Sequence, residues 1–550
     1  MKNFKPIIFL SIFLSILIFS VFNLTSCGKT DEIPAEKSIS DSENEFLGYG
    51  IIDYSTYMQY NKDYKENRTN LISQLYYNDK PLPKDSGDDK YFLPVSPDND
   101  NWLGGSLTFA GDDIKLYFIR MQDDIFSNLD IGNIIAENKL FIIIAINEEK
   151  KLYSVNRLVL TGLPIMTINN KHTVRSKEYP IGDADADAIM KLFEPNQKIT
   201  VSDIKIHTRG GSSRSFPKIG YKMNLVDEIG EKSNLNLLGM RNDDDWHLIP
   251  MYSDESKIRD KLTYDLWSAY AATNNNYNIH NGPQAEYIEL FLNDTYWGLY
   301  MLVVGIDKKQ QNLQPGEIIC KSESWEVPKL ETLKHAGNRN QLNSITVKKP
   351  DKVTQDTWNK IYDIVDLWFE MPREEVMKKA GKIIDLDNII DYWIFINITK
   401  GKDNGWKNIY MTWKKNTDNS YTVLLAPWDC DLSWGVMWAE TEALLWEYQF
   451  YLAEEIVDFQ LGNRLIRYNY DNAVSKLQKR WNELRKGILD EKNLFHRIDD
   501  LTSVIHDSGA WKRDLKRWPH AGHSNDMNEY LKEFTKANFK YLDDYISGLG

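Results

Sequence analysis

Cysteine is scarce in this chain of 550 residues, since only Cys27, Cys320 and Cys430 occur. No two of them have the close spacing of metal-binding cysteines, so the sequence predicts neither a zinc site nor a disulfide framework. Blocks of basic residues are missing as well. The 66 lysines and arginines against 80 aspartates and glutamates give a formal charge of −14, which argues against nucleic acid as a partner.

Aromatic residues, in contrast, are abundant, with 17 Trp and 30 Tyr. This content is typical of globular proteins and argues against a largely disordered chain. At this length we expect two or three domains, each with its own core. Aromatic side chains also suit a sugar-binding surface, so a carbohydrate-associated surface protein is one hypothesis, although packing in the core explains them more simply.

The N-terminus contains a long apolar run. Two lysines precede the run from Pro6 to Phe22, and Leu-Thr-Ser and Cys27 follow it, which is the pattern of an export signal. The segment resembles a bacterial lipobox, which implies a signal peptide over residues 1–27 and lipidation of Cys27. The alternative is a transmembrane anchor, but a run of about 17 residues is marginal for a hydrocarbon core of about 30 Å. We expect an exported protein, anchored by lipid to the cell membrane or the outer membrane.

Three further regions differ in composition and in the periodicity of their apolar residues. Residues 28–46 are polar and acidic without periodic apolar positions, so we expect a flexible tether. Residues 47–160 contain short apolar runs separated by turn residues, which predicts a small β-rich accessory domain. From residue 161 to residue 550 strand and helix patterns alternate. The fold class expected from these patterns is therefore α+β.

Local patterns predict individual elements within residues 161–550. Alternating apolar residues predict two hairpins, and apolar residues at helical spacing predict four helices. The hairpins are 201–207 with 221–226, and 287–292 with 297–303 around an Asn-Asp turn; strands are also predicted at 409–413 and 421–426. The helices are 254–271, 387–398 with Asp385 or Asp387 as its cap, 443–456 and 528–546.

The first candidate site is the tip of the hairpin around residues 205–225. Its turn reads Arg209-Gly210-Gly211-Ser212-Ser213-Arg214 and offers backbone N–H groups, hydroxyls and two guanidinium groups to an anion. Lys222 on the returning strand is a candidate to reach phosphate groups, as the strand-three lysine of protein kinases does. Alone, the pattern fits equally well an ordinary Gly-Ser hairpin tip with a solvated lysine on its strand.

The second candidate site follows the apolar helix 387–398. Asp403 and Asn408 stand five residues apart, which is the interval between base and metal ligand in the kinase catalytic loop. After the strands at 409–413 and 421–426 come Asp429 and Asp431, six and four residues before Gly435, where kinases carry a metal-binding Asp near a glycine. The simpler alternative is that Asp403 only forms a turn and that Asp429 and Asp431 only cap the end of a strand. The order of all these parts favours transfer of a phosphoryl group from ATP.

Further segments carry a resemblance to a known family. Residues 209–222 resemble the signature RGxSSRxFPKxxY(K/R) of the spore-coat protein H (CotH) kinase family, and the match continues in the segments 237–240, 243–246, 252–254, 261–267, 293–300 and 427–435. The resemblance covers roughly residues 160–550. It implies an atypical protein-kinase-like fold and phosphorylation of protein Ser or Thr with ATP and Mg²⁺ or Mn²⁺.

The resemblance also implies roles for single residues. Lys222 and the turn 209–214 would bind ATP, Asp403 would be the catalytic base, and Asn408 and Asp429 would hold the metal, with Asp431 as a further ligand.

One position departs from the family pattern, because Val304 stands where many relatives carry an acid. Asp254, Glu255 or Asp265 are the candidates to pair with Lys222 instead. A catalytically silent, kinase-fold binding module on the cell surface is therefore the alternative to an active enzyme.

Two metal-like patterns are set aside. Asp183, Asp185 and Asp187 mimic the spacing of a calcium loop, but the glycine that such a loop needs is replaced by Ala188, so an acidic turn is expected. His520 and His523 have no third ligand nearby in the sequence and are expected to be a surface pair.

Overall fold

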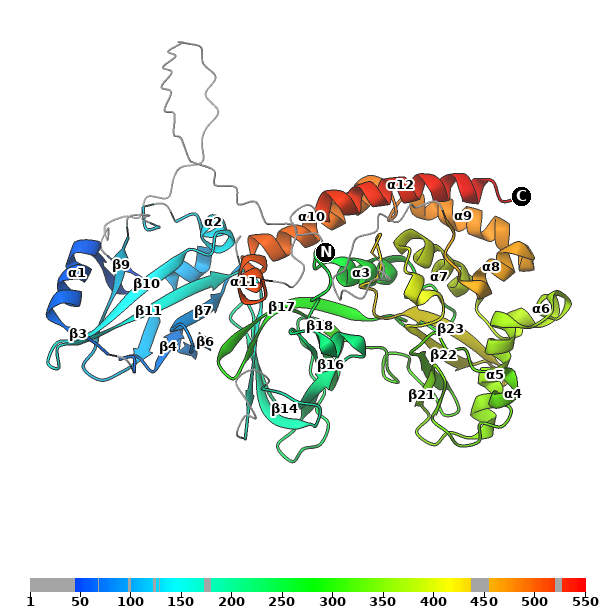
Figure 1. Ribbon diagram of the computed structural model, residues 1–550, viewed down its shortest axis with the longest axis horizontal. Helices are drawn as coiled ribbons and strands as arrows, with labels where there is room; N and C mark the ends of the chain where they lie inside the picture. The colour runs from blue at the N-terminus through cyan, green and yellow to red at the C-terminus, as the bar shows by residue number, and fades with distance from the viewer. Residues whose placement is uncertain are drawn as a thin grey trace, which may run out of the picture. The chain divides into compact units, whose positions relative to one another are not determined.

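Helices and strands are mixed along the chain, as the predicted α+β class requires (Figure 1). The computed structural model describes residues 45–67, 69–96, 100–121, 125–127, 129–172, 180–436, 455–519 and 527–550. The predicted signal peptide with Cys27, nearly all of the tether, most of the predicted helix 443–456 and the His520/His523 pair lie outside these residues. Among the described helices, none has the length and apolar character that crossing a membrane requires.

Residues 45–161 form an eight-stranded sheet and a three-stranded sheet, in agreement with the predicted β-rich pattern. The first strand starts at Glu45, within the last two residues of the predicted tether, and Phe46 is buried. Strand β10 is apolar on both faces, because Phe141 and Ile143 pack into one core while Ile144 and Ile146 pack into another. That residues 47–160 are a separate domain stays a prediction.

The elements of this region are β1 (Glu45–Phe46), β2 (Tyr49–Asp53), α1 (Tyr54–Asp63), β3 (Lys65–Glu66), β4 (Gln74–Tyr77), β5 (Lys80–Pro81), β6 (Lys84–Asp85), β7 (Lys90–Pro94), β8 (Leu107–Ala110), β9 (Lys115–Arg120), α2 (Ile131–Ala136), β10 (Leu140–Asn147) and β11 (Leu152–Thr161). The large sheet has the order β1-β2-β9-β10-β11-β7-β6 with β3 beside β11, and the small one the order β5-β4-β8.

A closed barrel follows, in the order β12-β13-β14-β15-β16-β18-β17. Both predicted hairpins are confirmed, since β14 pairs with β15 and β17 pairs with β18. Asn293 and Asp294 turn the second hairpin with positive φ angles of 48° and 55°. The barrel strands are β12 (Ile165–Asn170), β13 (Ala186–Phe193), β14 (Ile199–Arg209), β15 (Gly220–Val226), β16 (Asp245–Ile249), β17 (Gln284–Leu292) and β18 (Thr295–Val304).

Alternation along the barrel strands separates an apolar interior from a polar exterior. On β15, Tyr221 and Met223 pack inside the barrel, so Lys222 between them faces outward. Val304 on β18 packs inside as well.

The remaining residues form a five-stranded sheet, in the order β20-β21-β19-β22-β23, and most of the helices. The elements are α3 (Arg259–Tyr270), β19 (Ile318–Ser322), α4 (Leu330–Leu333), β20 (Gln341–Leu342), β21 (Ile345–Lys349), α5 (Gln355–Phe369), α6 (Arg373–Lys379), α7 (Leu386–Thr399), β22 (Ile409–Lys415), β23 (Tyr421–Pro427), α8 (Gln460–Arg467), α9 (Ala473–Arg485), α10 (Glu491–Asp507), α11 (Ala510–Arg517) and α12 (Met527–Ser547).

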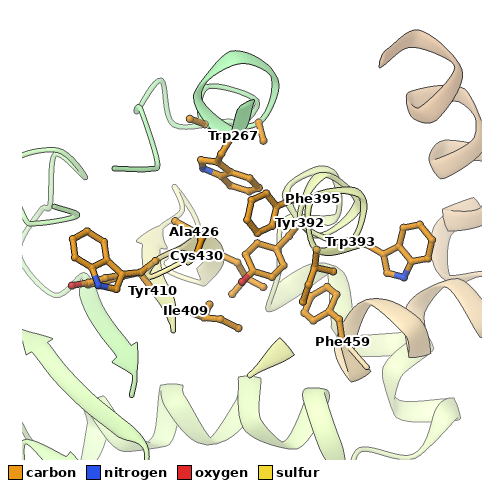
Figure 2. Close-up of a cluster of buried hydrophobic side chains, with 14 of the residues drawn as sticks. Trp267, Tyr392, Trp393, Phe395, Ile409, Tyr410, Ala426, Cys430 and Phe459 are labelled. Carbon is orange, nitrogen blue, oxygen red and sulfur yellow. The ribbon is translucent and has the colours of Figure 1, made fainter. Parts of the chain in front are cut away.

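Helix α7 is the centre of the largest core. Every residue from Asn388 to Thr399 is buried, which explains why the helix is apolar on all sides. Figure 2 shows Trp267 of α3 beside Tyr392 and Phe395 of α7, with ring centroids 5.8 Å and 5.3 Å apart. Asp385, and not Asp387, caps the helix by accepting two backbone N–H groups.

The helix predicted over 254–271 begins later, at Arg259. The Asp254 carboxylate accepts the backbone N–H groups of Ser256 and Arg259 and so holds a turn ahead of the helix. This local bonding competes with helical hydrogen bonds, and the predicted start was wrong by five residues.

Helix α11 packs against the barrel strand β18, and a buried ion pair fixes this contact. Lys218 Nζ lies 2.7 Å from Asp514 Oδ1, and both side chains are fully buried, at 0% exposure. The same carboxylate accepts the backbone N–H of Leu299, while Lys218 donates to the Leu299 carbonyl. The pair therefore joins the segment after the glycine-rich turn to the C-terminal helices.

We expect Asp514→Ala to destabilise the protein by about 3–5 kcal/mol, because it leaves the Lys218 ammonium buried without a counter-charge. Urea unfolding measures the loss. Asp500→Ala on the exposed face of α10 is the matched control and is expected to change stability by less than about 0.5 kcal/mol. Equal stability of the two variants would contradict the structural role assigned to the pair.

Candidate functional site

One cleft, with a volume of about 600 Å³, collects most of the predicted site residues. The barrel contributes the turn after β14 and the segment after β16, α3 contributes its first turn, and the rest comes from β19 and from the loops after α7 and β23. The predicted residues that line the cleft are Arg209, Gly210, Gly211, Ser213, Asp403, Asn408, Asp429 and Asp431. Segments far apart in sequence thus converge on one cavity.

The glycine-rich turn closes one side of the cleft. Gly210 has a φ of +121°, a conformation that favours glycine, and a side chain there would collide with Ser213 Oγ. The chain then forms the short 3₁₀ turn η2 (Ser212–Ser215). Arg214 does not line the cleft, because it forms an ion pair with Asp183 on the segment before β13. Because Gly210 has no side chain, the backbone N–H groups of the turn can come close to an anion bound in the cleft.

The acids with calcium-like spacing pair with basic residues of the barrel. Asp185 lies 2.7 Å from His207, and Asp187 lies 3.0 Å from Lys205. These contacts agree with the expected acidic turn.

Lys222 lies on the outer face of β15, and its Nζ is 3.0 Å from Asp245 of β16. It is not among the residues that line the cleft. The acids proposed from the sequence, Asp254, Glu255 and Asp265, form no ion pair with it among the described residues, so that expectation was wrong; two of them pair with α3 residues instead. That Lys222 binds phosphate stays a prediction.

Val304 lies inside the barrel, directly opposite Trp246 in the strand register. Its side chain is fully buried among apolar residues. Because Lys222 faces outward, a carboxylate at position 304 in this geometry would point to the opposite side of the sheet. The Val304 departure therefore removes no partner from Lys222 in this structure.

The loop after α7 presents Asp403. The helix ends at Thr399, Lys400 adopts a left-handed conformation with φ 51°, and Asp403 lies in a 3₁₀ turn. The Asp403 carboxylate lies 2.6 Å from Lys407 Nζ and accepts the indole N–H of Trp325 at 3.3 Å. These two contacts orient the carboxylate at the cleft.

Asn408 is fixed through its backbone. Its N–H donates to Ser322 at the end of β19, and its carbonyl accepts the N–H of Trp428 after β23. Asn404 strengthens the arrangement, because its amide donates to the carbonyls of both Asn408 and Trp428. The Asp403 loop and the Asp429 loop are therefore held against each other by hydrogen bonds.

The loop after β23 places two carboxylates next to a third that the sequence did not indicate. Asp260, in the first turn of α3, accepts the backbone N–H of Cys430 at 2.7 Å. The N–H of Asp429 donates to the Tyr264 hydroxyl, and Ser253 donates to Asp431 at 3.3 Å. The only sequence signal for Asp260 is its position beside the family-like segment 261–267.

Burial and like charge dominate the electrostatics of these acids. Burial, followed by repulsion from Asp429 and Asp403, raises the pKa of Asp431. Burial and the charges of Asp431 and Asp429 raise the pKa of Asp260 further. A divalent cation in the cleft would relieve this repulsion.

The donor set fits Mg²⁺ or Mn²⁺ in part. Asp429 and Asp431 offer carboxylate oxygens and Asn408 an amide oxygen, which are the ligands that Mg²⁺ prefers. Within the described ranges, no three His, Cys, Asp or Glu side chains form a metal site by themselves. This agrees with the general behaviour of Mg²⁺, which is held by one or two carboxylates and completed by phosphate oxygens and water.

Lys321 on β19 is a second site residue that the sequence did not indicate. Burial lowers its pKa to about 8, against the opposing attraction of Asp429. Its Nζ lies 5.7 Å from the ring centroid of Trp428 and 5.9 Å from that of Tyr410. A lysine within the otherwise apolar run Ile-Ile-Cys-Lys-Ser was the one available signal.

Comparison with protein families agrees with this arrangement. The family model described as CotH kinase protein matches residues 206–542, which is more than half of the chain. The chain belongs to the CotH kinase family. The match includes the glycine-rich turn from β14 onward and every acid of the cleft. No match was found among the curated proteins.

We expect Mn²⁺ or Mg²⁺ to raise the melting temperature, because a cation that binds only the folded cleft stabilises it by about 2.7 kcal/mol at a hundredfold excess over its Kd. Asp429→Asn is expected to lose most of this shift. Asp418→Asn on the exposed turn before β23 is the matched control and is expected to keep it. A shift of the same size in both variants would contradict metal binding at Asp429.

Proposed function

We propose that this CotH-family chain is an ATP-dependent kinase with an atypical protein-kinase-like fold, which phosphorylates Ser or Thr of proteins outside the cytoplasm. The observation that carries the proposal is the cleft, in which the anion-binding turn at Gly210 and Gly211 faces the acids Asp403 and Asp429. Family membership supports the same chemistry. Phosphoryl transfer needs these groups and little else, because positioning and charge stabilisation supply most of the catalysis.

A two-lobed arrangement supports the kinase-like fold. On one side of the cleft are the barrel, with its glycine-rich turn, and helix α3. On the other side are the loop after α7, the β22–β23 hairpin and the acids that follow it. Loop, hairpin and metal-binding acid follow one another in this order in protein kinases.

Binding of ATP is assigned to groups of both sides. The backbone N–H groups of the turn and the Arg209 guanidinium contact the phosphates, and Lys222 stays a candidate for the same role. Asn408, Asp429 and Asp431 would hold Mg²⁺ or Mn²⁺, which when bound neutralises charge on the phosphate oxygens.

Asp403 is proposed as the catalytic base. It accepts the proton of the substrate hydroxyl while the hydroxyl oxygen forms a bond to the γ-phosphorus. The bond between that phosphorus and the β,γ-bridging oxygen breaks, its electron pair stays on the bridging oxygen, and ADP leaves. Lys407 and Trp325 keep the Asp403 carboxylate in place.

Asp403→Asn is expected to reduce turnover by a factor of about 10²–10⁴, since an amide cannot accept the hydroxyl proton, while ATP and metal still bind. A phosphorylation assay beside calorimetric ATP binding separates the two effects. Asp356→Asn, an exposed position on α5, is the matched control and is expected to keep full turnover. Loss of ATP binding in Asp403→Asn would assign Asp403 to the metal instead.

The second candidate function is a silent binding module on the cell surface. The sequence observation in its favour is Val304, which stands where many relatives carry an acid; because Val304 points into the barrel, the missing acid would act there and not on Lys222. Wild-type protein that binds no ATP, with either Mg²⁺ or Mn²⁺ present, would establish this candidate and overturn the kinase proposal.

Lipidation of Cys27 is proposed as the means of anchoring, supported by the lipobox-like sequence before it. Cys27→Ser is expected to leave the precursor unprocessed or released, because a hydroxyl cannot form the thioether that carries the lipid. Partitioning into detergent, together with the mass of the product, measures this. A serine variant that still partitions with membranes at the mature mass would contradict the lipobox hypothesis.

A further inference from the structure

Lys321 is half-buried at the wall of the cleft and has no counter-ion within the part of the chain that the structure describes. Its strand β19 lies between β21 and β22 in the sheet, and Lys321 is paired in register with Tyr410 of β22. Its Nζ lies near the rings of Tyr410 and Trp428. Among the described residues, no carboxylate is within ion-pairing distance of Nζ.

Three other lysines, Lys222, Lys407 and Lys218, differ in this respect, because each has a carboxylate within 3.0 Å. An ammonium that is partly withdrawn from water without an anion is unfavourable, and two aromatic rings offset only part of that loss. Lys321 therefore has an unused capacity for an anion, and it lines the cleft.

The surroundings of Lys321 indicate which kind of anion fits. Arg209 lies on the barrel side of the same cleft and is close enough to act on the charge of Lys321. Asp429, a proposed metal ligand that lines the same cleft, also acts on the charge of Lys321. An anion bound here would contact two cationic side chains and also border the metal site, which suits a polyphosphate better than a single carboxylate.

We propose that Lys321 binds the polyphosphate chain of the nucleotide together with Arg209. This inference rests on the proposed function, since it adds to the phosphate-binding groups that the sequence indicated. The compact ammonium acts as a point charge, held in place by the rings of Tyr410 and Trp428 and therefore pre-organised before the ligand arrives.

Calorimetric binding of inorganic tripolyphosphate and of ATP, each with Mn²⁺, tests the proposal on the full chain. Lys321→Met keeps the apolar stem but removes the charge, and it is expected to weaken both ligands by at least about tenfold. Lys415→Met, at the exposed end of the adjacent strand β22, removes a lysine that does not line the cleft, so it is the matched control. Its affinities are expected to stay within about threefold of wild type.

A second measurement does not depend on the folding of a variant. Wild-type protein is treated with an amine-acetylating reagent, and modification of each lysine is measured by peptide mass spectrometry with and without tripolyphosphate. We expect the anion to protect Lys321 and to leave the acetylation of the exposed Lys415 unchanged. Equal acetylation of Lys321 in both samples would overturn the proposal, as would unchanged affinities in Lys321→Met.

The outcomes distinguish this inference from the proposed function. If tripolyphosphate binding depends on Lys321 but no protein is phosphorylated, the anion site stands and the kinase proposal fails. If phosphorylation occurs and Lys321→Met binds ATP as wild type does, the kinase proposal stands and this inference fails. Wild-type protein that binds neither ligand would overturn both. Lys222→Met, measured beside these variants, shows which of the two lysines contributes more to the affinity for ATP and tripolyphosphate.

Discussion

The structure of the site depends on holding buried, like-charged carboxylates in one cleft. Asp260, Asp429 and Asp431 come from two segments, and each is held by a backbone or hydroxyl hydrogen bond. Their mutual repulsion and burial raise the pKa of Asp260 and Asp431. Such an arrangement is unfavourable for the chain alone, so the fold must be rigid enough to impose it, and a bound cation would offset the repulsion.

That rigidity comes from the core behind the cleft. Helix α7 is buried along most of its length and ends directly before the loop of Asp403, while β22 begins directly after Asn408 and its partner β23 ends two residues before Asp429. The site residues therefore lie in short loops at the ends of well-packed elements. This division lets the loops hold unusual backbone conformations, such as the positive φ of Asn408 and of Asp429, without losing position.

Much of the local structure could be predicted from the sequence. Both barrel hairpins, helix α7 and the pair β22–β23 follow from short-range periodicity, and motifs such as those at 209–222 and 427–435 indicated the family. The start of α3 was missed, because one side chain, Asp254, competes with the helix for backbone N–H groups. Periodicity records which face is apolar and does not record such local hydrogen bonds.

The sequence by itself determined the alternation that turns Tyr221 inward and Lys222 outward, and the order of the groups that phosphoryl transfer needs. Only the tertiary structure decided which charges meet. Asp260 and Cys430 are 170 positions apart, yet they are joined by a hydrogen bond, and Lys222 is paired with Asp245 on the neighbouring strand. The physical reason is that side-chain periodicity acts over a few residues, whereas contacts between distant segments depend on how the whole chain packs.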